Sequence, residues 1–251
     1  MATYRGATLA GVVTNTAFGF ILSYVLLAVF RERGVVDGFD ATDAVTFTFV
    51  AQGLLMPVGL FGSDREMAER ILTGEVAMDL SRPYDYQGWW AAVALGKAWF
   101  YVWARGLPPF LAASLVLHLR LPTGEPWVWV AFPVSVALAV GVAFTWGFLL
   151  QLTAFWIIDV RGPTQIGWFG AQFLAGMLVP VFLFPDGLEA VARALPFVAM
   201  LQLPAEVFLG KHAGADLLAV YGHQVVWLVV LAGAGRLVLA RAVRRVVVHG
   251  G

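Results

Sequence analysis

The chain has 251 residues, of which 60% are hydrophobic and 13% are charged, and its formal net charge is zero. A soluble domain usually carries about a quarter charged residues, so this composition, with a mean hydropathy of +0.80, indicates an integral membrane protein. The absence of cysteine excludes disulfides, thiol nucleophiles and thiolate metal sites, and the balanced charge offers no basic surface for nucleic acid.

The first predicted membrane span covers residues 8–30. No charged residue occurs between Arg5 and Arg31. This run exceeds the roughly 7 to 15 apolar residues of a signal-peptide core, and it is long enough to cross a bilayer, which takes about 20 residues. We therefore interpret it as a retained span.

Further charge-poor runs predict five more spans, so the expected fold is an all-α membrane protein with six transmembrane helices. These runs cover residues 44–62, 89–117, 127–158, 166–184 and 217–239, and the third contains Lys97 and Arg105. The segment at about 185–216 is apolar but is broken by Pro185, Pro196 and Pro204. Because proline interrupts a helix, we expect this segment to be interfacial or re-entrant on the extracytoplasmic side.

The distribution of basic residues predicts the orientation of the chain. Six spans place both termini on the same side, and the side richer in Lys and Arg is normally cytoplasmic. The terminal side would receive Arg5, Arg65, Arg70, Arg82, Lys97, Arg161, Arg236, Arg241, Arg244 and Arg245, and the other side Arg31, Arg33, Arg120, Arg193 and Lys211. We therefore expect both termini, and the loop after the second span, to be cytoplasmic.

Charged residues crowd into that loop. It holds nine of the 16 acidic and 16 basic residues. Ser63 and Glu66 fit a capping box at the start of a short helix, Glu66 and Arg70 have the spacing of a helical ion pair, and Gly74 is placed to end the helix. Such an element fits a docking surface for another protein, or else a solvated loop on lipid headgroups. The nine residues are Asp64, Arg65, Glu66, Glu69, Arg70, Glu75, Asp79, Arg82 and Asp85.

The same loop contains the pattern ILTGEVAMDLSRPYD, which resembles the permease subunits of type-2 ABC exporters. The similar group is a bacterial subfamily of about this length with a Gly-Glu…Leu-x-Arg-Pro signature in its cytoplasmic loop. The Phe155-Trp156 pair late in the fourth span is also similar, and the topology is similar over the whole chain, including the broken segment before the last span. The signature residues are Gly74, Glu75, Leu80, Arg82 and Pro83.

This resemblance implies a single transmembrane permease domain over residues 1–251, in the cytoplasmic (inner or plasma) membrane of a bacterium. It implies that the loop at about 63–88 couples to separate ABC ATPase subunits, and that a second permease, identical or related, completes the translocation path. The alternative is a secondary transporter or channel that works without an ATPase. The implied coupling residues are Glu66, Glu69, Arg70, Gly74, Glu75, Arg82 and Pro83.

Sequence motifs for catalysis are absent. The chain has no G-x-x-x-x-G-K-[ST] motif, no H-E-x-x-H and no G-x-S-x-G. We therefore expect no catalytic residue and no cofactor, and we expect ATP hydrolysis to occur in a partner chain.

Three aspartates recur at every third residue between the first two spans. Asp37, Asp40 and Asp43 could form a cation site. The other interpretation is a turn at Asp37 and Gly38 followed by a helix N-cap near Thr42 or Asp43, and with it we expect no metal site.

Arg105 lies inside the third apolar run, where charge is costly and often functional. It could line the translocation path, pair with Asp159 unless Arg161 takes that carboxylate, or extend to an interface. Gly106, Pro108 and Pro109 follow closely and predict a kinked or broken helix.

Small residues recur at spacing four in the fourth span. Such rows allow two helices to approach closely, either within the chain or across a dimer, and we expect packing within the chain. The rows are Ala139, Ala143 and Gly147, and Ala137, Gly141 and Thr145.

Overall fold

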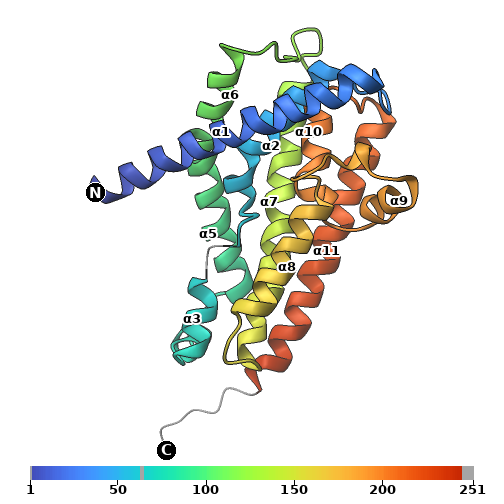
Figure 1. Cartoon of the computed structure of the whole chain (residues 1–251). Coiled ribbons are helices and arrows are strands. Elements are labelled where there is room, and N and C mark those ends of the chain that lie inside the picture. The colour runs from blue at the N-terminus through green and yellow to red at the C-terminus, as the bar shows by residue number, and fades with distance from the viewer. Residues whose placement is uncertain (1, 63–64, 245–251) are drawn as a thin grey trace, which may run out of the picture.

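The computed structural model describes residues 2–62 and 65–244, and all regular elements in these residues are helices. The longer ones form an elongated bundle, with α1 running obliquely across it (Figure 1). The elements are α1 (Ala2–Arg33), α2 (Ala41–Val58), α3 (Glu66–Leu72), α4 (Val76–Leu80), α5 (Tyr86–Tyr101), the π-helical turn η1 (Val102–Gly106), α6 (Leu107–Ser114), α7 (Val128–Leu152), η2 (Thr153–Phe155), α8 (Arg161–Leu174), η3 (Val181–Leu183), α9 (Asp186–Ala194), η4 (Val198–Met200), α10 (Gln202–Phe208) and α11 (Ala215–Val243).

Four stretches of the described helices are long and apolar enough to cross a membrane. They are Thr8–Arg33, Ala41–Val58, Val128–Phe155 and Ala215–Val243, and they coincide with the first, second, fourth and sixth predicted spans. The class of all-helical membrane protein predicted from composition is therefore confirmed. The remaining two predicted spans have different structures.

The third predicted span is one helical rod with a defect in its middle. Helices α5 and α6 join without a break through η1, where the N–H of Leu107 bonds to the carbonyl of Val102. This widened turn is the irregularity that Gly106, Pro108 and Pro109 predicted, because proline supplies no N–H to the helix ladder. The rod is irregular, as expected, but it does not break.

The fifth predicted span, residues 166–184, is not a single helix. Helix α8 has 14 residues, which is about 21 Å of helix, and it ends at Leu174. Gly176 then has φ of 83°, a conformation that glycine adopts without steric cost. Pro180, which lacks an N–H, precedes the short turn η3. This turn chemistry stops the helix short of the roughly 30 Å of a bilayer core.

The α1–α2 connection contains the predicted turn but a different cap. Asp37 and Gly38 both have positive φ, as the turn predicted. The N-cap of α2 is Asp40, whose carboxylate accepts from the N–H of Asp43, and the Asp43 carboxylate accepts from the N–H of Asp40. The prediction of an N-cap at Thr42 or Asp43 was wrong by two to three residues. Burial would raise the pKa of Asp40, but the Asp43 N–H and Arg120 outweigh burial and lower it.

Helix α7 is the packing centre of the bundle. It contacts α2, α5, α8, α10 and α11, and its small residues allow this. A Cβ on Gly141 would lie 3.1 Å from Leu228 of α11, and a Cβ on Gly147 would lie 2.9 Å from Trp168 of α8. These two members of the small-residue rows therefore pack within the chain, as predicted.

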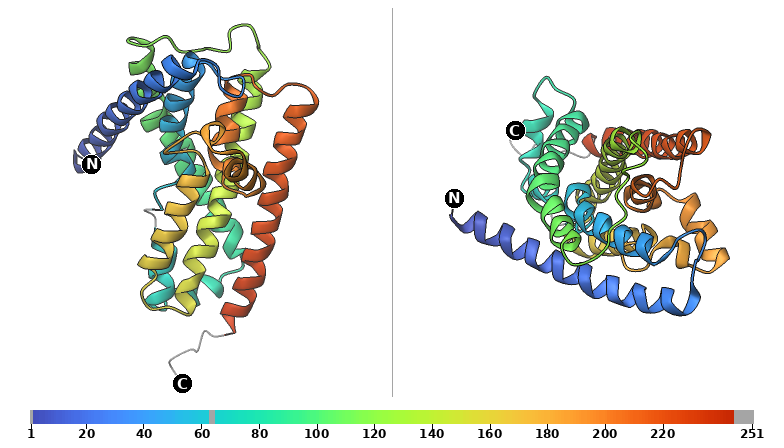
Figure 2. Two further views of the ribbon diagram at one scale, coloured as in Figure 1. Left: turned by 45° about the vertical axis from the view of Figure 1, so that its right-hand side comes forward. Right: turned by 90° about the horizontal axis from the view of Figure 1, so that it is seen from above.

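The proline-broken segment folds into the protein rather than over it. Helix α9 and turn η4 lead to α10, all of whose residues are buried. Helix α10 packs against α2 and α7, and Figure 2 shows it within the bundle beside α11. The segment is divided into separate short helices, as the prolines predicted, and α10 is buried among its neighbours.

Candidate functional site

The charged loop forms a compact helical hairpin at one end of the bundle. We call residues 65–85, which hold α3, α4 and their connections, the charged hairpin. Gly74, with φ of 81°, makes the turn between the two helices, and Figure 1 shows the hairpin near the end at which α11 finishes. Helix α3 begins at Glu66 with Arg65 at its N-cap position. The predicted capping box involves Ser63, which lies outside the described residues.

A bidentate ion pair braces the two helices of the charged hairpin. Arg70 donates from Nε to Asp79 Oδ2 at 2.6 Å and from Nη2 to Asp79 Oδ1 at 2.7 Å. Asp79 is 4% exposed, and Glu75 lies 3.3 Å from Arg70. The Asp79 hydrogen bonds raise the pKa of Arg70 further above its ordinary value. Such paired, charge-assisted bonds fix geometry as well as adding energy.

The apolar underside of the charged hairpin is seated on the bundle. Its buried side chains form one cluster with Tyr86 of α5 and with the end of α7 and the loop that follows it. The N–H of Ala68 also donates to the Gln151 side chain at 3.2 Å. Helix α3 is therefore packed on the end of α7. The hairpin members of this cluster are Met67, Ala68, Ile71 and Val76, with Leu80 packed against them.

The outward surface of the charged hairpin mixes charge with apolar groups. Most of the predicted coupling residues lie on it: Glu66, Glu69, Gly74, Glu75, Arg82 and Pro83 are exposed. Leu72 and Met78 are exposed beside them, at 45% and 61%. Arg70 differs, because its guanidinium is directed to Asp79 within the hairpin. The sequence interpretation counted Asp79 among the charges of the loop but did not predict that it is buried and pairs with Arg70, although a lone carboxylate in the apolar stretch VAMDL was a signal of a buried partner.

The charged hairpin is also tied to the neighbouring helices by charge. Glu66 lies 3.7 Å from Lys97 of α5. At the other end, Asp85 caps α5 by accepting from the N–H of Gly88 at 2.6 Å, and it lies 3.7 Å from Arg236 of α11. The two ends of the hairpin therefore contact α5 and α11 of the helical bundle.

Arg105 lies in η1, against α1. Its guanidinium carbon lies 2.7 Å from the position that a Cβ on Gly11 would take, and 5.9 Å from the ring centroid of Tyr101. Asp159 accepts from the N–H of Arg161 at 3.0 Å in an exposed loop, so Arg161 takes that carboxylate, as one of the two alternatives predicted.

A cavity lies above the charged hairpin, between α2, α5, α7 and α8. It has a volume of about 390 Å³. Its wall is mostly apolar and aromatic, with Trp90, Tyr101 and Trp168 among its residues, and the Lys97 and Gln151 side chains add polar groups. A concave, mostly apolar site with few polar groups is the usual form of a small-molecule site.

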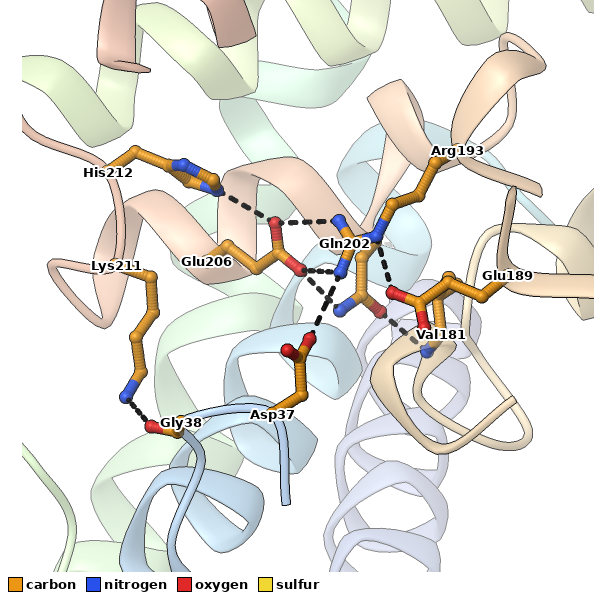
Figure 3. Close-up of polar contacts among 9 residues, drawn as sticks. All are labelled: Asp37, Gly38, Val181, Glu189, Arg193, Gln202, Glu206, Lys211 and His212. Carbon is orange, nitrogen blue, oxygen red and sulfur yellow. Dashed lines mark hydrogen bonds and ion pairs between the residues drawn. The ribbon is translucent and has the colours of Figure 1, made fainter. Parts of the chain in front are cut away.

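A second charged cluster, which the sequence interpretation did not find, holds α10 in place (Figure 3). Glu206, only 2% exposed, accepts from Arg193 at 3.2 Å and from Gln202 at 2.9 Å, and lies 2.9 Å from His212 Nε2. Burial would raise the pKa of Glu206, but His212, Arg193 and Gln202 together outweigh burial and lower it. Its two oxygens therefore both have hydrogen-bond partners.

The same cluster extends to the α1–α2 turn. Lys211 donates to the Gly38 carbonyl at 2.7 Å and to the Asp43 carboxylate at 2.6 Å, and Asp37 lies 3.9 Å from Arg193. Asp40 and Asp43 thus cap α2, Asp37 lies in the preceding turn, and all three have basic partners. The described residues contain no group of acidic, His or Cys side chains arranged to hold a metal ion.

Taken together, the long apolar helices and the absence of other regular structure in the described residues define an all-helical membrane protein. The family described as ABC-2 family transporter protein matches residues 14–250. The chain therefore belongs to this family. No significant match was found among curated proteins or solved structures.

Proposed function

We propose that this chain is the permease subunit of an ATP-driven exporter in the cytoplasmic membrane of a bacterium, coupled through the charged hairpin to separate ABC ATPase subunits. The observation that carries the proposal is the hairpin itself. It is braced internally by Arg70 and Asp79, seated on α7 through its apolar underside, and charged on its outward surface. A rigid element with these three properties can receive force from a partner and pass it to the bundle.

The proposed topology has six crossings with both termini on the cytoplasmic side. The α5–η1–α6 rod is the third crossing. The fifth crossing consists of α8 followed by the chain that leads to the buried α9–α10 segment. Helix α8 has only 14 residues and is too short to cross the membrane by itself, so the chain after it completes the crossing. Helix α11 then returns to the end of the bundle that carries the charged hairpin (Figure 1), which supports a cytoplasmic C-terminus.

The proposed complex contains two permeases, identical or related, on two ATPase subunits. In this complex Arg70 holds the shape of the hairpin through its bonds to Asp79, and the ATPase is contacted by the exposed residues of the hairpin. These are Glu66, Glu69, Gly74, Glu75, Arg82 and Pro83. Arg105, charged and within the third crossing, is the residue proposed to face the translocation path. ATP binding would move the ATPases, and the hairpin would carry that movement to α5 and α7.

The test is purification of the tagged chain from its native host in mild detergent, followed by mass spectrometry. We expect a stoichiometric ATPase with a G-x-x-x-x-G-K-[ST] motif, and either one or two kinds of permease chain. A chain that purifies without an ATPase, and that forms no crosslink to one through a cysteine at position 75, would contradict the proposal and favour a transporter or channel that works alone.

A further inference from the structure

The cavity above the charged hairpin carries an inference about what the protein binds. Its volume of about 390 Å³ lies within the roughly 300 to 1,000 Å³ of small-molecule sites. Phe61, Trp90, Phe144 and Trp168 are among the residues that line it. These walls suit an apolar or aromatic body and supply no carboxylate to attract a cation.

The polar part of the cavity has a defined charge. Lys97 is the only charged side chain among the described residues that line it. It lies eleven residues into α5, and its side chain is 42% exposed, so an anionic group can reach the ammonium. A ligand that combines an apolar body with an acidic group would therefore match both the walls and the charge.

One counter-ion of Lys97 belongs to the charged hairpin. Glu66 Oε2 lies 3.7 Å from the Lys97 ammonium, and the two side chains are 57% and 42% exposed. Ion pairs this open to solvent are weak, so a ligand carboxylate or phosphate can replace Glu66. Glu66 is the first residue of α3, and its release would remove this ion pair between the hairpin and α5.

We propose that the cavity binds an amphipathic anion whose acidic group takes the place of Glu66 on Lys97. As a statement about the exported substrate class, this inference rests on the proposed function. As a statement about binding, it concerns this chain alone. Both an exported apolar acid and an acidic membrane lipid have the required chemistry.

The test measures photolabelling of the full chain in phosphatidylcholine nanodiscs. The probe is a diazirine derivative of dodecanoic acid, and the matched probes are its primary amide and the corresponding amine. Labelled peptides are identified by mass spectrometry. We expect the acid to label peptides from α5, α7 or α8 more than the amine does.

Three variants locate the site. Lys97→Gln should reduce labelling by the acid about tenfold, as expected for loss of one hydrogen bond to a charged group, and leave labelling by the amide unchanged, which also shows that the cavity is intact. Glu66→Gln should increase labelling by the acid roughly twofold to fivefold, because an exposed ion pair no longer competes. Ala94→Trp, which fills the cavity from α5, should reduce labelling by the acid and by the amide.

The control is Arg161→Gln, which removes a positive charge from a side chain that is 78% exposed and does not line the cavity. Labelling by the acid that is the same in Lys97→Gln as in the unaltered chain, or an amine that labels as well as the acid, would overturn the proposal.

Addition of phosphatidylglycerol to the nanodiscs separates the two sources of the anion. Competition with the acid probe assigns the site to a lipid, and absence of competition assigns it to an exported acid. Both results support an anion site. The labelling needs no nucleotide or ATPase, so a failure to label would not contradict the exporter proposal. Likewise, purification without an ATPase would not contradict the binding result.

Discussion

Two arginines of the charged hairpin have the same charge and opposite environments. Arg70 donates to the buried Asp79, whereas Arg82 is exposed beside Pro83. A residue whose bonds lie within the hairpin supports its shape, and an exposed one is available to a partner. The two positions should therefore respond differently to substitution.

Reversal of the exposed charge tests the docking role. We expect Arg82→Glu to reduce ATP-dependent export at least about tenfold, because like charges placed together at an interface cost several kcal/mol. Abundance in the membrane and thermal stability should be unchanged. Export is measured in cells or inverted vesicles, with Arg161→Glu as a control on another exposed loop. Glu75→Arg is less specific, because Glu75 also lies 3.3 Å from Arg70. Normal export by Arg82→Glu would contradict docking at this residue.

Loss of the buried charge tests the brace. Asp79→Asn keeps the size of the side chain and removes its charge, so both bonds from Arg70 weaken. We expect amide hydrogen exchange in residues 65–85 to accelerate roughly tenfold, since local opening needs less free energy. Exchange in α7 serves as the internal reference, and Asp159→Asn is the matched control in an exposed loop. Unaltered exchange in the hairpin would show that the apolar underside alone holds it.

At the scale of elements, α2 and the π-helical turn η1 approach until their backbones touch. A Cβ on Gly106 would lie 2.7 Å from the carbonyl oxygen of Gly53, and a Cβ on Gly53 would lie 3.1 Å from the carbonyl oxygen of Gly106. A backbone oxygen cannot turn aside as a flexible side chain can. The close packing of α2 against η1 therefore requires glycine at both positions, whereas the formation of each helix does not.

Addition of one methyl group at this contact should separate the helices. We expect Gly106→Ala to destabilise the chain by about 1–3 kcal/mol, as overpacking does. Gly96→Ala is the matched control, because no atom lies within 4 Å of its Cβ position and alanine favours a helix interior over glycine by roughly 0.5–1 kcal/mol. Thermal unfolding in detergent measures both. Equal stability of the two variants would be inconsistent with a tight contact.

From the cluster around Glu206 we expect the attachment of α10 to depend on pH. The pKa of Glu206 is lowered from its ordinary value of 4.5, so its contribution to stability is complete above that value and is lost as pH falls through the lower folded-state pKa. We expect the difference in melting temperature between the unaltered chain and Glu206→Gln to be constant at neutral pH and to shrink below about pH 4.5. A constant difference down to pH 3 would exclude this role.

At the scale of the whole molecule, the proposed topology places the charged hairpin and the connection between α10 and α11, which contains His212, on opposite sides of the membrane. The chain has no cysteine, and Glu75 and Ala213 are both exposed, so single cysteines there report their own side. We expect an impermeant maleimide to label Ala213→Cys in intact cells and Glu75→Cys only in inside-out vesicles. Labelling of both from one side would rule out the arrangement.

The sequence by itself determined the class of protein, four of the spans, the position of the charged hairpin and the break before the last helix. These features depend on local properties: the length of an apolar run, the crowding of charges, and prolines that interrupt a helix. For the same reason the irregularity near Arg105 could be predicted. None of them requires knowledge of which segments lie side by side.

Only the tertiary structure decided which side chains meet. Asp79 pairs with Arg70, and Glu206 pairs with Arg193 and His212. Gly53 and Gly106 form a close backbone contact. It also showed that α8 stops short and that α10 is buried. These outcomes depend on the packing of helices that are distant in the chain, where the fit of whole surfaces selects one arrangement among many that the local pattern allows.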